Sequence, residues 1–119
     1  MKSVLMLFML VCLVSTAFSG QVEVVDANVK SQGNDQYRFD VTLQHKDTGW
    51  EHYADRWEIL DTDGNVLATR VLHHPHTNEQ PFTRSLTATL PDTVEKVVIR
   101  GHDKIHNYGE KEKAVSLPR

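Results

Sequence analysis

The sequence predicts an all-β domain over residues 20–119, and three observations lead to this prediction. Apolar and polar residues alternate with a period of two in most segments, as they do on half-buried strands. No segment of this part shows the 3.6-residue apolar repeat of an amphipathic helix. Short runs rich in Gly, Pro, Asn and Asp separate the alternating segments and are typical of turns.

Seven strands are expected. The clearest is residues 37–44, where apolar and polar residues alternate without interruption, and Asp63-Gly64 indicates a tight hairpin further on. The expected strands cover residues 21–29, 37–44, 53–60, 66–73, 82–90, 94–100 and 113–117. Such a series of short strands is typical of a seven-stranded immunoglobulin-like or fibronectin-III-like sandwich, with Trp57 as a buried aromatic residue. A small barrel is the alternative fold.

Residues 1–19 have the pattern of a secretory signal peptide. Lys2 is their only charged residue, an apolar run covers residues 4–14, and Ala17-Phe18-Ser19 supplies small residues for cleavage. The apolar run is shorter than the roughly 20 residues that a membrane-spanning helix needs. We expect cleavage before Gly20, a single domain from there to Arg119, export to the periplasm or the medium, and no membrane attachment after cleavage.

Composition excludes several classes of function for the expected mature chain. It carries 12 Lys and Arg against 16 Asp and Glu, a formal charge of −4, which argues against a nucleic-acid partner. Its lack of cysteine excludes internal disulfides, thiolate metal sites and cysteine nucleophiles. All seven histidines of the chain lie in this part.

The histidines are concentrated in alternate connections between the expected strands. In an antiparallel traverse the second, fourth and sixth connections lie at one end of the molecule, and loops on such a scaffold often carry function. These connections contain or border His45, His52, His73, His74, His76, His102 and His106. Because imidazole is the commonest metal-donating side chain, we predict a transition-metal site built from three loops.

The candidate ligands follow from the loops. The preferred set is His52, His74, His76, His102 and His106, and His45 and His73 are weaker candidates. Glu51, Glu79 and Asp103 are candidates to orient the rings, and Arg84 is a candidate anion contact or ion-pair partner. Imidazole with carboxylate suits zinc, copper(II), nickel or iron, and composition does not select among them.

Other interpretations stay open. His45 continues the apolar face of its strand, so it is also explained as a hydrogen-bonded histidine at the edge of the core. The histidines could instead act together as a pH sensor. A metal-free module that recognises a protein or another ligand through the same loops is a further alternative. The sequence decides neither the partner nor the oligomeric state, nor whether the protein is an enzyme.

One segment resembles a known family. Residues 50–60, Trp-Glu-His-Tyr-Ala-Asp-Arg-Trp-Glu-Ile-Leu, are similar to the Glu-His-Tyr-Ile-x-Trp-Ile-x-Leu segment of superoxide reductases of the desulfoferrodoxin type. That family is an immunoglobulin-like sandwich whose iron is held by four histidines and a cysteine. The family's Cys-Asn-x-His-Gly motif corresponds to the region 102–109. The resemblance implies His52 and His106 as ligands, His45 as a weaker one, and superoxide reduction as an alternative function.

The chain also departs from this family. It lacks the cysteine and the early histidine ligand, has Lys46 where the family has a proline, and adds the histidines at 73–76. The run from His74 to Arg84 is similar instead to small uncharacterised exported bacterial proteins.

Overall fold

The computed structural model describes residues 20–118, so the expected signal peptide lies outside the described residues. The described chain contains only β-strands as regular elements: β1 (Glu23–Gly33), β2 (Gln36–Gln44), β3 (Ala54–Leu60), β4 (Val66–Val71), β5 (Phe82–Thr89), β6 (Lys96–Asp103), β7 (Asn107–Tyr108) and β8 (Lys113–Ser116). The all-β prediction is confirmed for this part. No helix long and apolar enough to cross a membrane occurs within residues 20–118.

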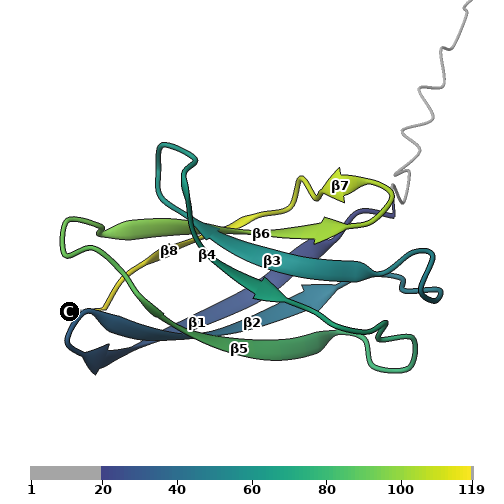
Figure 1. Cartoon of the computed structure of the whole chain (residues 1–119), viewed down its shortest axis with the longest axis horizontal. Helices are drawn as coiled ribbons and strands as arrows, with labels where there is room; N and C mark the ends of the chain where they lie inside the picture. Colours follow the sequence, from purple (N-terminus) through teal and green to yellow (C-terminus); the bar gives the residue numbers. More distant parts are fainter. Residues whose placement is uncertain (1–19, 119) are drawn as a thin grey trace, which may run out of the picture.

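The strands form two antiparallel sheets. One has the order β1-β2-β5, and the other has the order β4-β3-β6, with β7 and β8 each paired to β6. Figure 1 shows the first sheet lying below the second, with the strands of both running along the long axis of the view.

Alternation along the strands decides which side chains fill the space between the sheets. On β2, Phe39, Val41 and Leu43 are fully buried, while the residues between them are more exposed. On the second sheet, Trp57 and Ile99 are equally buried. Side chains from both sheets thus form one hydrophobic cluster, because successive side chains of a strand point to opposite faces.

The largest differences from the expected strand boundaries occur in the first and sixth strands. The β1–β2 hairpin reverses at Asn34 and Asp35, both with positive φ, so β1 continues to Gly33, beyond the expected strand end at residue 29. The sixth expected strand, 94–100, lies at 96–103, and the expected loop after it contains β7. The described residues therefore form eight strands instead of seven, because His102 and Asp103 pair back onto Tyr108 and Asn107.

Candidate metal centre

Three connections that are far apart in the sequence meet at one end of the molecule. They are the loop 45–53 between β2 and β3, the loop 72–81 between β4 and β5, and the turn 104–106 between β6 and β7, at the right of Figure 1. The turns 34–35 and 61–65 and the connection 90–95 lie toward the other end.

Strand alternation carries two polar side chains into this end of the core. His45 directly follows β2 and continues the buried series that includes Val41 and Leu43, and its residue exposure is only 2%. Asp103 is the last residue of β6, in phase with the buried Ile99, and is completely buried. The two strands belong to different sheets. The imidazole of His45 therefore faces the carboxylate of Asp103 at the end of the core between the sheets.

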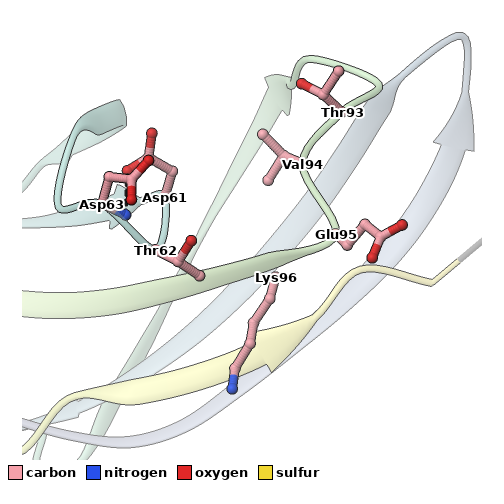
Figure 2. A pocket seen from close by; sticks show the side chains of 7 residues that line it. All are labelled: Asp61, Thr62, Asp63, Thr93, Val94, Glu95 and Lys96. Carbon is pink, nitrogen blue, oxygen red and sulfur yellow. Dashed lines mark hydrogen bonds between the residues drawn. The ribbon is translucent and has the colours of Figure 1, made fainter.

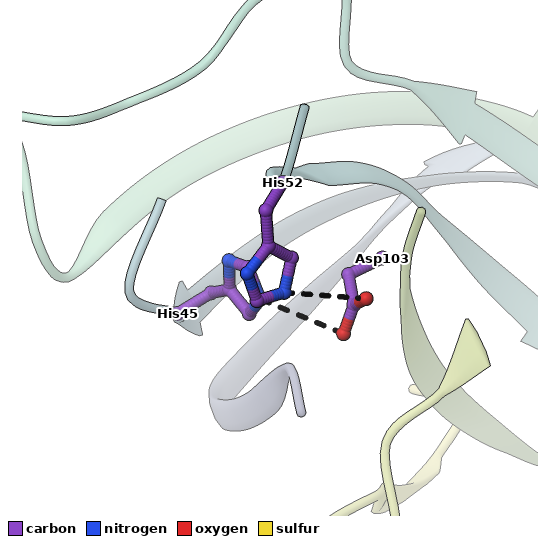
Figure 3. Close-up of side chains that lie close together, drawn as sticks. All are labelled: His45, His52 and Asp103. Carbon is purple, nitrogen blue, oxygen red and sulfur yellow. Dashed lines mark ion pairs between the residues drawn. The ribbon is translucent and has the colours of Figure 1, made fainter. Parts of the chain in front are cut away.

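His52, from the loop 45–53, completes a three-residue cluster that could hold a metal ion. One donor atom from each of His45, His52 and Asp103 lies within 4.8 Å of the others. His45 Nε2 is 3.5 Å from Asp103 Oδ2, and His52 Nε2 is 3.5 Å from Asp103 Oδ1. Figure 3 shows both rings directed at the two oxygens of the carboxylate. The rings of His45 and His52 meet edge to face, with centroids 4.8 Å apart.

His106 lies at the solvent side of this cluster. Its Nδ1 is 3.5 Å from Asp103 Oδ1, and its ring centroid is 5.0 Å from that of His52. The backbone N–H groups of Ile105 and His106 both donate to Asp103 Oδ1, at 2.8 and 2.6 Å. The turn is therefore folded around the buried carboxylate, which leaves Asp103 Oδ2 without a hydrogen-bond partner among the described residues.

Asp47 orients His45 from behind. Its Oδ1 is hydrogen-bonded to His45 Nδ1 and accepts from the backbone N–H of Ala54 at 3.0 Å. Its Oδ2 accepts from the backbone N–H of His76 at 2.7 Å. A neutral His45 that donates from Nδ1 directs the lone pair of Nε2 toward Asp103, and metal-bound histidines are commonly oriented by a carboxylate in this way.

Burial and charge act on these groups in opposite directions. Burial lowers the pKa of His45, but the hydrogen bond and charge of Asp47 and the charge of Asp103 raise it more, so its pKa is raised overall. For Asp47, burial raises the pKa, while hydrogen bonds from His45, His76 and Ala54 lower it below the ordinary value. Asp47 is therefore held ionised against the ring it orients.

The buried donor atoms fit a metal ion. His45 Nε2, His52 Nε2 and Asp103 Oδ2 are buried and have no hydrogen-bond partner within the described chain. An unpaired buried polar group costs about 1–3 kcal/mol. Three such atoms facing one another, two from imidazoles and one from a carboxylate, form the kind of donor set that divalent transition metals take.

The predicted pair His74 and His76 lies beside this cluster. Their ring centroids are 4.6 Å apart, and the buried His76 stacks on Phe82 at 4.0 Å, whereas His74 is exposed. His76 Nδ1 is 3.9 Å from Asp47 Oδ2, on the side of Asp47 away from His45. Burial, followed by the charges of Arg84 and His74, lowers the pKa of His76, which favours the neutral ring.

The other predicted residues have partners of their own or lie at the surface. His102 Nδ1 is 2.6 Å from Asp55 Oδ1, and His73 is exposed. Glu51 accepts a hydrogen bond from the Thr48 hydroxyl at 3.4 Å. Arg84 donates to Glu79 at 3.0 Å, so it forms an ion pair, one of the two roles considered for it from the sequence.

Sequence reasoning missed Asp47 and placed Asp103 in a loop as an orienting group. Both residues can be found in the sequence, because each continues the series of inward-facing positions of the strand before it. Asp47 follows Leu43 and His45 at intervals of two, and Asp103 follows Ile99 and Gly101 in the same way. Extending the inward-facing series past the expected strand ends would have found them.

A hollow lies away from the histidines, toward the other end. Figure 2 shows its lining, which consists of Asp61, Thr62, Asp63, Thr93, Val94, Glu95 and Lys96. The carboxylate of Asp61 is occupied by its own turn, since it accepts from the backbone N–H groups of Asp63 and Asn65 and from the Asn65 amide.

Comparison with known proteins gives one informative relative. The chain is 43% identical over 89 residues to a protein of Halomicrobium mukohataei described as a "putative lipoprotein". The match covers 75% of this chain and 44% of that protein, so the chain spans less than half of its relative's length. No model of a known protein family matches the chain, and no solved structure matches it. The comparisons do not show the resemblance to superoxide reductases.

Proposed function

We propose that the protein is an exported β-sandwich module that binds a divalent transition metal through His45, His52 and Asp103, with His106 beside them. The observation that carries the proposal is the group of buried, mutually facing donor atoms without hydrogen-bond partners in the described chain. His45 Nε2 and Asp103 Oδ2 are buried 3.5 Å apart, and neither atom has a hydrogen-bond partner within the described chain. A metal ion between them would satisfy both atoms.

The distances support this proposal. Donor atoms held about 2.0–2.1 Å from a tetrahedral ion are about 3.3–3.4 Å from one another. Both nitrogen–oxygen separations to Asp103, 3.5 Å, are close to that spacing. The widest donor separation, within 4.8 Å, has to shorten on binding.

The donor set narrows the class of metal. Two imidazoles and a carboxylate suit zinc, copper(II), nickel(II) or iron(II), and the lack of thiolate and thioether ligands disfavours copper(I). Three protein ligands leave a coordination position for water, a further side chain or a substrate, as in catalytic zinc sites.

We assign the fold to the immunoglobulin-like class, and the strand order supports this. The sets β1-β2-β5 and β3-β6-β8 correspond to strands A, B, E and C, F, G of that class. The fourth strand, β4, pairs with β3 at the edge of the second sheet instead of joining the first. Export as a single domain from Gly20 is supported by the signal pattern, and the lipoprotein relative points to the cell envelope or the exterior.

The test is metal binding by purified, untagged protein, followed with zinc, copper(II), nickel(II) and iron(II) in turn. We expect one equivalent of metal to bind, and His52→Ala to weaken binding by about 10–100-fold or more, since even the loss of an outer partner costs that much. His74→Ala is the matched control, because this exposed histidine lies outside the cluster. We expect its affinity to stay unchanged.

The same titration separates the alternatives. Loss of binding in His74→Ala but not in His52→Ala would move the site to the pair His74 and His76. Absence of binding for all four metals would overturn the metal function and favour the metal-free recognition module.

A redox activity at this site is a second candidate, favoured by one spacing. Asp103 precedes His106 by three residues, as the cysteine precedes the histidine in the superoxide reductase motif, and both lie with His45 and His52 in one cluster. The iron(II)-loaded protein is expected to consume superoxide faster than the metal-free protein does, because superoxide oxidises the bound iron(II). A site that takes up only zinc, or an iron site inert to superoxide, would contradict this candidate.

A further inference from the structure

The segment that precedes β1 is held in a seat made by two glycines. Val22 is fully buried. A Cβ on Gly101 would be 2.3 Å from Val22 Cγ1, and one on Gly109 would be 1.8 Å from the Val22 carbonyl oxygen. Nothing larger than glycine fits at either position without displacing this segment. Val22 therefore packs in this place only because Gly101 and Gly109 have no side chains.

Polar contacts hold the same segment in register on either side of Val22. The Gln21 side chain accepts a hydrogen bond from the Glu110 N–H at 3.2 Å, and the Val24 N–H donates to the Lys111 carbonyl at 3.0 Å. The position of the residue before Gln21 is therefore set by the fold.

That residue, Gly20, lies against the metal centre. A Cβ on Gly20 would be 2.8 Å from His106 Cε1, 3.3 Å from His106 Nδ1 and 3.4 Å from His52 Cε1. The Gly20 backbone also contacts the ring of His45, where it contributes to the raised pKa of that side chain. The α-nitrogen is one bond of about 1.46 Å from the same Cα, so it also lies within a few ångströms of the rings of His52 and His106.

We infer that the α-amino group of Gly20, freed by removal of the signal peptide, is a ligand of the metal bound by His45, His52 and Asp103. This inference rests on the proposed function. Metal ligands bind in their deprotonated form and release protons on binding, so a free α-amine is able to act as a nitrogen donor. It would fill the position that three protein ligands leave open.

The inference makes metal binding depend on processing. In the uncleaved chain the same nitrogen belongs to a peptide bond, where its lone pair is delocalised into the carbonyl group. The precursor therefore lacks one ligand, and full affinity appears only after export and cleavage. A protein of this design avoids binding the metal tightly before it reaches its destination.

The experiment compares three forms of one chain: residues 20–119 with a free Gly20, the same chain preceded by Ser19, and the first form acetylated at Gly20. Each is titrated with zinc against a competing chelator. We expect the free-Gly20 form to bind at least about tenfold more tightly than the other two, since loss of even an outer partner costs about 10–100-fold. Circular dichroism verifies that all three are equally folded.

A second measurement reports on the amine itself. Zinc is expected to protect the Gly20 α-amine from an acylating reagent, while the lysines react as before. Equal zinc affinity of all three forms, or no protection, would overturn the inference and leave the histidine–aspartate site standing. Absence of zinc binding by every form would overturn both. A mass of the exported protein that shows a first residue other than Gly20 would also overturn the inference.

Discussion

Asp47 joins three separate parts of the metal end through one buried carboxylate. It is bonded to the ring of His45 and to the backbone of Ala54 and His76, which belong to two different loops and the start of β3. The side chain is completely buried. A residue with this many buried partners contributes to stability whether or not a metal is bound.

We predict that Asp47→Ala destabilises the metal-free protein by about 3 kcal/mol or more, because it leaves three buried donors unpaired at about 1–3 kcal/mol each. Urea unfolding followed by tryptophan fluorescence measures the change. Asp63→Ala, at an exposed position, is the control and should change stability by less than about 0.5 kcal/mol. A similar small effect for Asp47→Ala would show that this carboxylate does not organise the site.

The scale of single residues also explains why the histidines differ in role despite similar spacing. His45 and His76 are both buried, yet only His45 directs a ring nitrogen at a carboxylate oxygen at 3.5 Å. His76 instead stacks on Phe82 and lies 3.9 Å from a carboxylate that already has other donors. Both ring nitrogens of His76 are also buried without a hydrogen-bond partner in the described chain, so the two histidines are separated by the distance to a carboxylate, which spacing does not encode.

At the scale of elements, β6 determines the position of the metal end. It pairs with β3 along one edge and with β7 and β8 along the other. Its inward positions carry Val97, Ile99, Gly101 and Asp103. The first two belong to the hydrophobic core, Gly101 packs against Val22, and Asp103 provides the buried carboxylate. The close approach of Val22 is possible only because Gly101 has no side chain.

We predict that Gly101→Ala destabilises the protein by about 1–3 kcal/mol, the usual cost of overpacking. The added methyl group would meet Val22 Cγ1 at 2.3 Å and Val22 Cβ at 2.8 Å, so Val22→Ala should remove the closer of the two contacts. In a double-mutant cycle the two costs should therefore be less than additive, by about 0.5 kcal/mol or more. Strictly additive unfolding free energies would show that the two residues are not in contact.

For the whole molecule, stability and metal binding are linked. The expected mature chain has no cysteine, so its two sheets are held by their shared hydrophobic cluster, and the buried donors lie at one end of it. A ligand that binds only the folded state adds to the free energy of unfolding in proportion to the logarithm of its concentration.

We predict that free zinc at a hundred times its dissociation constant stabilises the protein by about 2.7 kcal/mol. For a chain of this size that raises Tm by roughly 10–20 °C. Differential scanning calorimetry with and without a chelator measures the shift, which the chelator should reverse. His52→Ala should lose it, and an equal shift in that variant would place the stabilising metal elsewhere.

The sequence by itself determined the strands and which of their faces are apolar, because alternation with a period of two is written locally along the chain. It also determined that imidazoles and carboxylates are the strong metal donors available after Gly20. The resemblance in residues 50–60 and 102–109 indicated His52 and His106, with His45 as a weaker candidate, and these histidines lie together around Asp103.

Only the tertiary structure decided which donors face one another. The sequence ranked His45 below His74 and His76, because His45 continues the apolar face of its strand and is also explained as a histidine at the edge of the core. The buried cluster instead joins the ends of β2 and β6, which belong to different sheets. Their approach, and that of Gly20, depends on the packing of sheets and on two missing side chains, which are contacts between residues far apart in the chain.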